Sequence, residues 1–162
     1  GAAGKITSAF NIARTLALGA DWCNAARGYM FALGCIQALN CHTGRCPSGV
    51  ATQDPRRGNK LDVEHKSQRV YNYHKNTLDA LQNLLEASGL KHPSELGPEH
   101  IVRRVSKTEV HSYMDLFPFL EPGALLEGKT GLTIFDKYWE FARSDTFEPP
   151  EFILKLRETK LR

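Results

Sequence analysis

The segment SAFNIARTLALGADWCNAARGYMFALG (residues 8–34) decides the fold class, because helical and strand patterns alternate along it with glycines at the turns. Apolar residues recur at helical spacing after Ser8, which suits an N-cap, and Gly19 can end that helix in a left-handed conformation. Residues 20–26 are short and mostly apolar and predict a buried strand. Residues 27–39 predict a second helix. Helix, strand and helix in this order indicate an α/β fold with parallel strands.

Downstream of this segment the pattern is mostly helical. Residues 61–88 carry an apolar stripe and predict a long amphipathic helix that Gly89 ends. Residues 106–109 (SKTE) fit a capping box at the start of another helix, and residues 133–143 predict one more. Residues 151–162 are basic and amphipathic. We therefore predict a mostly helical extension after the α/β segment.

Composition excludes several classes of partner. The chain has 162 residues, of which 41% are hydrophobic, and its formal net charge is only +3. Such a charge does not indicate nucleic acid or an acidic membrane surface as a partner. The longest apolar stretch, residues 28–39, is shorter than the roughly 20 residues that cross a bilayer. Gly rather than Met opens the chain, which suits a processed or excised piece, and a membrane segment further upstream is left open.

Three of the four cysteines fall within 12 residues, and two of them lie in a predicted loop, residues 40–60, that is rich in glycine and proline. Their spacing is Cys35-x5-Cys41-x4-Cys46, followed by a proline. Iron–sulfur clusters are held by several thiolates on irregular backbone, whereas zinc sites usually pair cysteine and histidine half-sites. Spacing alone leaves four readings open: an iron–sulfur cluster, zinc, a disulfide, or thiols that bind nothing. The fourth cysteine, Cys23, falls in the predicted strand and is expected to be a small core residue.

The sequence from residue 4 to residue 55 resembles the FMN-binding domain of glutamate synthases, especially the stand-alone members that lack an amidotransferase domain. The motif that carries the resemblance is CIQ-x3-CHT-x2-CP-x-GVATQDP, which begins at Cys35. The resemblance extends to about residue 90, and residues 99–128 are similar to the C-terminal tail of the stand-alone members. It implies that Cys35, Cys41 and Cys46 bind a 3Fe–4S cluster.

The resemblance also implies a fold and a division into domains. The family domain is a (β/α)8 TIM barrel, and this chain would supply helix 7, strand 8 and helix 8 as its C-terminal fragment. Residues 1–60 would end the FMN-binding barrel, with the phosphate loops and the iron–sulfur loop. Residues 61–162 would form a mostly helical extension packed on the barrel. Residues 90–162 lack the glycine periodicity of the β-helix domain in large glutamate synthases, which favours the stand-alone architecture.

Phosphate sites of such barrels lie in the loops after strands 7 and 8, where backbone N–H groups at glycine turns and helix starts face the anion. The resemblance implies that the residues binding the FMN phosphate are Gly4, Lys5, Asn24, Ala25, Ala26 and Arg27. Two departures stand out. The loop before the first helix has one glycine where the commoner pattern D-G-G-x-x-T-G has three, and Gly44-Arg45 replaces the common Asn-Thr.

The implied activity is reductive amination of 2-oxoglutarate to glutamate, with nitrogen from ammonia or glutamine. Electrons would enter through the cluster from a donor such as ferredoxin or a reductase subunit. Substrate-binding and catalytic residues would lie upstream. Cluster assembly needs a reducing compartment, so we expect the cytoplasm. The alternatives are a related FMN enzyme, such as N-methylglutamate synthase, and a non-catalytic iron–sulfur or metal-binding redox module.

One competing motif is present. Residues 123–130, GALLEGKT, satisfy the P-loop pattern G-x4-G-K-T. A P-loop needs a strand before its first glycine, and Pro118 and Pro122 argue against one there. We therefore interpret the match as chance.

Overall fold

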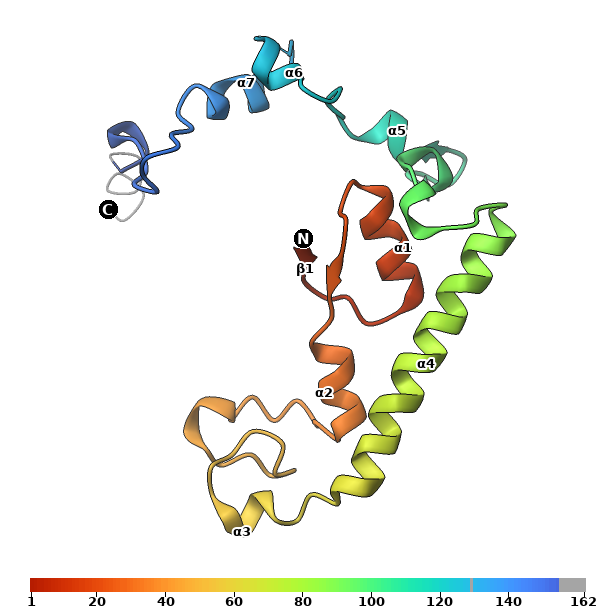
Figure 1. Cartoon of the computed structure of the whole chain (residues 1–162), viewed down its shortest axis with the longest axis vertical. Helices are drawn as coiled ribbons and strands as arrows, with labels where there is room; N and C mark the ends of the chain where they lie inside the picture. The colour runs from red at the N-terminus through yellow and green to blue at the C-terminus, as the bar shows by residue number, and fades with distance from the viewer. Residues whose placement is uncertain (129, 155–162) are drawn as a thin grey trace. The chain divides into compact units, whose positions relative to one another are not determined.

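The computed structural model describes residues 1–128 and 130–154, and the chain divides into two compact units, residues 1–116 and 117–162. Figure 1 shows the course of the chain. Helices and small two-stranded sheets make up the described residues, which agrees with the predicted α/β class.

The first unit begins with a parallel strand–helix–strand arrangement. Strand β1 (Ala2–Ala3) pairs in parallel with β2 (Cys23–Asn24). In this register Ala2 lies opposite Cys23, and Ala3 lies opposite Asn24. Helix α1 (Ala9–Ala17) connects the strands, and α2 (Arg27–Leu33) follows β2. Because the strands are parallel, the loops that follow them emerge at the same edge of the sheet.

Helix α1 begins and ends where the sequence predicts. The Ser8 hydroxyl accepts the backbone N–H of Asn11 at 3.3 Å, and Gly19 has a φ of +101°. The predicted extents of the next two elements were wrong. The strand covers two residues of the predicted seven, and α2 ends at Leu33 rather than at residue 39. Gly34 at φ +105° ends the helix, because its backbone turns left-handed there.

The long helix α4 (Val63–Ala87) confirms the predicted amphipathic helix. Asp62 caps it by accepting the backbone N–H of His65 at 3.0 Å. Figure 1 shows α4 running beside both α1 and α2. Buried Leu81 and Leu85 of α4 pack against two alanines of α1, whose small side chains leave room for the leucines. This contact forms a hydrophobic core of the first unit.

Short elements connect α2 to α4 and close the first unit. The cysteine loop contains a 3₁₀ turn, η1 (Cys41–Thr43), and a one-turn helix, α3 (Pro55–Gly58). Two more 3₁₀ turns, η2 (Pro93–Glu95) and η3 (Pro98–His100), follow α4. A second cluster of buried residues lies beyond them and consists of Ala17, Ile101 and Tyr113.

The capping box predicted at residues 106–109 was wrong. This segment is the turn of a hairpin between β3 (Val102–Arg104) and β4 (Val110–Ser112). The Ser106 hydroxyl accepts hydrogen bonds from the backbone N–H groups of Thr108 and Glu109. Such bonds stabilise a turn as readily as a helix start. The segment that follows the turn has a strand backbone, and the helix α5 (Tyr113–Leu116) begins only after it.

The second unit contains helices α6 (Ala124–Glu127) and α7 (Thr133–Trp139), and residues 151–154 are helical as well. Helix α7 is shorter than the predicted 133–143. In residues 117–122 no strand precedes the P-loop-like segment, and α6 lies inside the segment instead of following it. The basic tail predicted for residues 151–162 lies mostly outside the described residues. Throughout residues 1–128 and 130–154, no helix combines the length and the apolar character needed to cross a membrane.

Candidate functional site

The loops after β1 and β2 hold the residues that the resemblance assigns to the FMN phosphate. Gly4 and Lys5 follow β1 with φ values of +109° and +55°, so the loop turns left-handed twice in succession. Asn24 ends β2, Ala25 and Ala26 form the connection, and Arg27 opens α2. The parallel pairing of the strands brings both groups to one edge of the sheet. Their position is as expected, and their role toward FMN remains a prediction.

The start of α2 has backbone N–H groups without a side-chain cap. Ala26 occupies the N-cap position of α2, and no side chain there accepts a hydrogen bond from the first backbone N–H groups of the helix. Ala26 and Arg27 are exposed, and so are Gly4 and Lys5 in the loop that follows the neighbouring strand β1. A Cβ built on Gly4 would meet nothing within 4 Å. Glycine is therefore needed there for its backbone angle and not for space.

The three clustered cysteines line one pocket of about 320 Å³. Cys35, Cys41 and Cys46 all border it, and Ala26 and Arg27 at the start of α2 form another part of its wall. The structure thus brings together the three predicted cluster ligands and two of the predicted phosphate-binding residues. Since α2 is seven residues long, its two ends lie about 10 Å apart along the helix axis, and Cys35 follows the C-terminal end after Gly34.

The three clustered cysteines differ in their local surroundings. Cys35 follows the glycine that ends α2, and its backbone N–H donates to the Met30 carbonyl at 2.9 Å, as in a Schellman motif. Its sulfur accepts the backbone N–H of Gln37 at 3.5 Å. Cys41 opens the 3₁₀ turn η1 and is exposed. Cys46 is 8% exposed.

The sulfur of Cys46 lies among hydrogen-bond donors. The Ser48 hydroxyl, 3.3 Å from the sulfur, and the backbone of Ala51, Ser48 and Val50 lower the pKa of Cys46 to about 7, against the opposing effect of burial. The thiolate is the form of cysteine that binds metals, and hydrogen bonds to sulfur help to set the potential of iron–sulfur clusters. The surroundings of Cys46 therefore favour a ligating thiolate.

Within the cysteine loop, the segment around Gly49 lies close to α3. Gly49 has a φ of +76°, and a Cβ built on it would lie 2.5 Å from the carbonyl oxygen of Arg57. Its backbone N–H donates to the Cys46 carbonyl at 3.3 Å. The Thr52 hydroxyl donates to the Gly44 carbonyl, which closes the part of the loop between these two residues. Gly49 is thus required both for its left-handed backbone and for its close approach to α3.

The donor set fits an iron–sulfur cluster. The site offers three thiols on irregular backbone, and two of them have hydrogen-bond partners at sulfur. Among the described residues, no three histidine, cysteine or acidic side chains converge closely enough to hold one metal ion. A three-iron cluster takes one thiolate per iron, so its ligands need not meet at a single point. Cys23 lies apart from the three, in β2.

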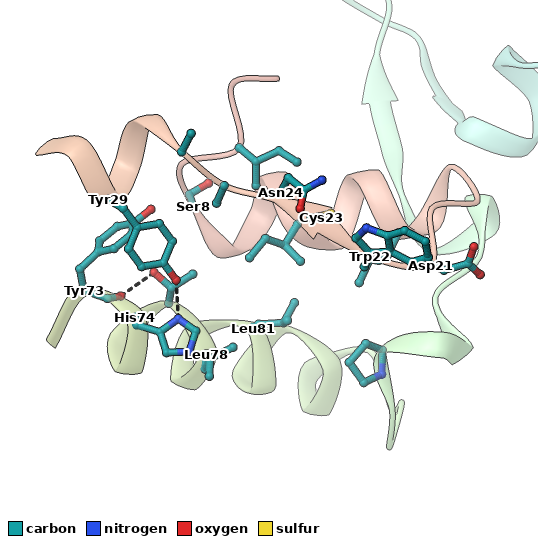
Figure 2. A pocket seen from close by; sticks show the side chains of 17 residues that line it. Ser8, Asp21, Trp22, Cys23, Asn24, Tyr29, Tyr73, His74, Leu78 and Leu81 are labelled. Carbon is teal, nitrogen blue, oxygen red and sulfur yellow. Dashed lines mark hydrogen bonds between the residues drawn. The ribbon is translucent and has the colours of Figure 1, made fainter. Parts of the chain in front are cut away.

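A second pocket, of about 500 Å³, lies between α1, β2 and α4 (Figure 2). Tyr29 of α2 and Tyr73 and His74 of α4 gather at one end of it, as Figure 2 shows. The two tyrosine rings meet edge to face with centroids 5.0 Å apart, and the Tyr29 hydroxyl is hydrogen-bonded to Nδ1 of His74. The Tyr73 hydroxyl donates to the Thr7 carbonyl at 2.9 Å. Sequence reasoning missed this group, because no local pattern relates residues so far apart in the chain.

Comparison with known proteins gives one matching family model and several related proteins. Residues 1–91 match the family model described as the conserved region in glutamate synthase. The chain is 50% identical over 103 residues to the glutamate synthase large subunit-like protein YerD of Bacillus subtilis. It is 37% identical over 89 residues to the archaeal glutamate synthase [NADPH] of Methanocaldococcus jannaschii, and 30% identical over 130 residues to the glutamate synthase [NADH] of Schizosaccharomyces pombe. No solved structure matches the chain.

These matches involve a small part of each relative. They cover 64%, 55% and 76% of this chain, but only 20%, 18% and 6% of the three relatives in the same order. The chain therefore spans at most about a fifth of these proteins. The family model covers more than half of the chain and includes both strand-end loops and the cysteine loop. The chain belongs to the glutamate synthase family.

Proposed function

We propose that the protein containing these residues is a glutamate synthase-like oxidoreductase that converts 2-oxoglutarate to glutamate by reductive amination. The observation that carries the proposal is the pocket lined by Cys35, Cys41 and Cys46, which shares Ala26 and Arg27 with the start of α2. The proposed cluster site and the proposed phosphate site thus adjoin each other. Family membership supports the same activity.

The cluster would be held by the three thiolates. The Cys35 sulfur accepts the backbone N–H of Gln37, and the hydrogen-bonding groups around the Cys46 sulfur lower its pKa, so both sites stabilise negative charge on sulfur. Cys41, the exposed member, leaves its thiol accessible to iron during assembly. Cluster assembly needs reduced thiols, so we propose the cytoplasm as the compartment.

The FMN phosphate would be held by the two strand-end loops. Uncapped N–H groups at the start of α2 would donate to the phosphate oxygens, and Lys5 and Arg27 would add positive charge. The small residues Gly4, Ala25 and Ala26 would let the backbone come close to the phosphate, and Asn24 would lie beside them where β2 ends. When bound, FMN supplies hydride transfer and a 3Fe–4S cluster supplies one-electron transfer.

We propose that residues 1–60 supply helix 7, strand 8 and helix 8 of a TIM barrel, and that residues 61–162 form an extension packed on it. The parallel pairing of β1 and β2, with a helix between them and a helix after β2, supports this arrangement. The substrate-binding residues would lie in the other barrel loops. The electron donor would be ferredoxin or a reductase subunit, and the nitrogen would come from ammonia or glutamine.

The test is product formation by the intact protein. Purified without oxygen and reduced chemically, it should oxidise its flavin when 2-oxoglutarate and ammonium are added together, with glutamate as the product. N-methylglutamate formed from glutamate and methylamine would favour the related synthase instead. Iron in the protein without flavin, and no product from either substrate pair, would contradict an enzymatic role.

A further inference from the structure

We propose that Tyr73 of α4 is a positioning residue for the FMN phosphate, acting through the loop that follows β1. The inference rests on the proposed FMN site. It assigns a role to a residue of the C-terminal extension, outside the two loops that would touch the phosphate. Its basis is the hydrogen bond from the Tyr73 hydroxyl to the Thr7 carbonyl, which measures 2.9 Å.

Thr7 lies within the loop that carries Gly4 and Lys5. Its own N–H and hydroxyl both lie 3.3 Å from the side-chain oxygen of Asn11 in α1. Tyr73 binds the remaining backbone group, the carbonyl. Thr7 is thus held from α1 on one side and from α4 on the other. A loop with two successive positive φ values depends on such contacts, because a left-handed backbone is unfavourable for Lys5, which has a side chain.

The same tyrosine lies against the start of α2. A Cβ built on Gly28, in the first turn of α2, would lie 2.0 Å from the Tyr73 hydroxyl oxygen. Tyr73 therefore reaches Thr7 only because residue 28 is glycine. The Tyr73 ring meets the ring of Tyr29 edge to face. The Tyr29 hydroxyl is hydrogen-bonded to His74, the residue that follows Tyr73 in α4 (Figure 2). Adjacent residues of α4 thus hold the loop after β1 and the first turn of α2 at a fixed spacing.

The spacing matters because both loops would donate N–H groups to one phosphate. Donors placed in advance bind an anion more tightly than donors that must be ordered on binding. A net hydrogen-bond contribution corresponds to a change in affinity of roughly three- to tenfold. Loss of the Tyr73 hydroxyl should therefore weaken phosphate binding by that factor without removing a contact to the flavin.

The experiment measures FMN and riboflavin affinities of the intact protein by flavin fluorescence, because riboflavin lacks the phosphate. Tyr73→Phe should bind FMN roughly three- to tenfold more weakly and riboflavin as tightly as the wild type. Tyr71→Phe is the matched control. It removes an exposed hydroxyl from the same helix and should change neither affinity.

Three outcomes would overturn the inference. An unchanged FMN affinity in Tyr73→Phe would show that the hydrogen bond does not position the loop. Equal losses for FMN and riboflavin would assign Tyr73 a merely structural role. A wild type that binds FMN no better than riboflavin would contradict the proposed phosphate site itself. The last outcome separates failure of the proposed function from failure of the role of Tyr73.

Discussion

At the scale of the residue, the cysteine loop depends on one glycine more than on its neighbours. Gly49 combines a left-handed backbone with a Cβ position 2.5 Å from the Arg57 carbonyl oxygen, whereas Gly44 has a similar φ and open space around it. The left-handed backbone costs a residue with a side chain about 1–2 kcal/mol. Overpacking adds roughly 1–3 kcal/mol where there is no room.

We therefore predict that Gly49→Ala lowers the iron content of the purified intact protein well below that of Gly44→Ala. The added methyl group would push the loop from α3 and disturb Cys46, whose carbonyl accepts the Gly49 N–H. Iron and protein assays on both variants check this. Equal iron retention in the two variants would show that contact with α3 does not support the thiols.

At the scale of the element, α4 is held against α1 by few buried side chains. Leu81 is 8% exposed and packs against Ala9 and Ala13, whereas Leu78, on the same helix, is 47% exposed. Leu81→Ala should lower the free energy of unfolding by about 2–5 kcal/mol, because it leaves a cavity between the helices. Leu78→Ala should cost less than about 1 kcal/mol. Denaturant titration of both variants measures the difference, and equal losses would contradict the packing described.

The capping box of α5 gives a pH-dependent prediction. The Ser112 hydroxyl donates to the Asp115 carboxylate at 2.7 Å, and the Asp115 N–H donates back to the Ser112 hydroxyl oxygen at 3.2 Å. The Ser112 hydroxyl, the Ser112 backbone N–H and nearby His111 lower the pKa of Asp115 below its usual 3.8. Because the folded-state pKa is depressed, the stabilisation is present above about pH 4 and is lost as the pH falls through the folded-state value.

Asp115→Asn should therefore lower the midpoint temperature of thermal unfolding at pH 7. The difference in midpoint temperature between the variant and the wild type should shrink below pH 3.8. Glu109→Gln is the control. Glu109 lies in the hairpin turn, where sequence reasoning placed the capping box, and this substitution should have little effect at either pH. A difference for Asp115→Asn that stays constant from pH 7 to pH 3 would exclude the charged carboxylate as its cause.

The elements also show which parts of the structure the sequence could predict. Local signals placed the start of α1 at Ser8 and the end of α4 at Gly89 within about a residue, because capping groups act over one turn. The end of α2 was missed because residues 35–39 continue its apolar pattern beyond Gly34. The capping box is formed by Ser112 and Asp115, and not by Ser106 and Glu109 as the sequence predicted. Both pairs have a serine three residues before an acidic residue, and the pairing of β3 with β4 makes the first pair part of a hairpin turn.

At the scale of the whole molecule, the candidate site was predictable only in its local parts. The spacing of Cys35, Cys41 and Cys46 is visible in the sequence, and their shared pocket agrees with it. The contact of Tyr73 with Thr7 joins residues 66 positions apart, and no periodicity encodes it. It follows from the packing of α4 against α1 and α2, which is a property of the folded unit.

The central claim is that the three clustered cysteines bind a 3Fe–4S cluster, and electron paramagnetic resonance of the intact protein purified without oxygen tests it most directly. The wild type and Cys23→Ser should both give the signal of an oxidised three-iron cluster, because Cys23 does not line the cysteine pocket. Cys41→Ser should lose the signal. A signal that persists in Cys41→Ser, or a wild type that contains zinc and gives no such signal, would contradict the account.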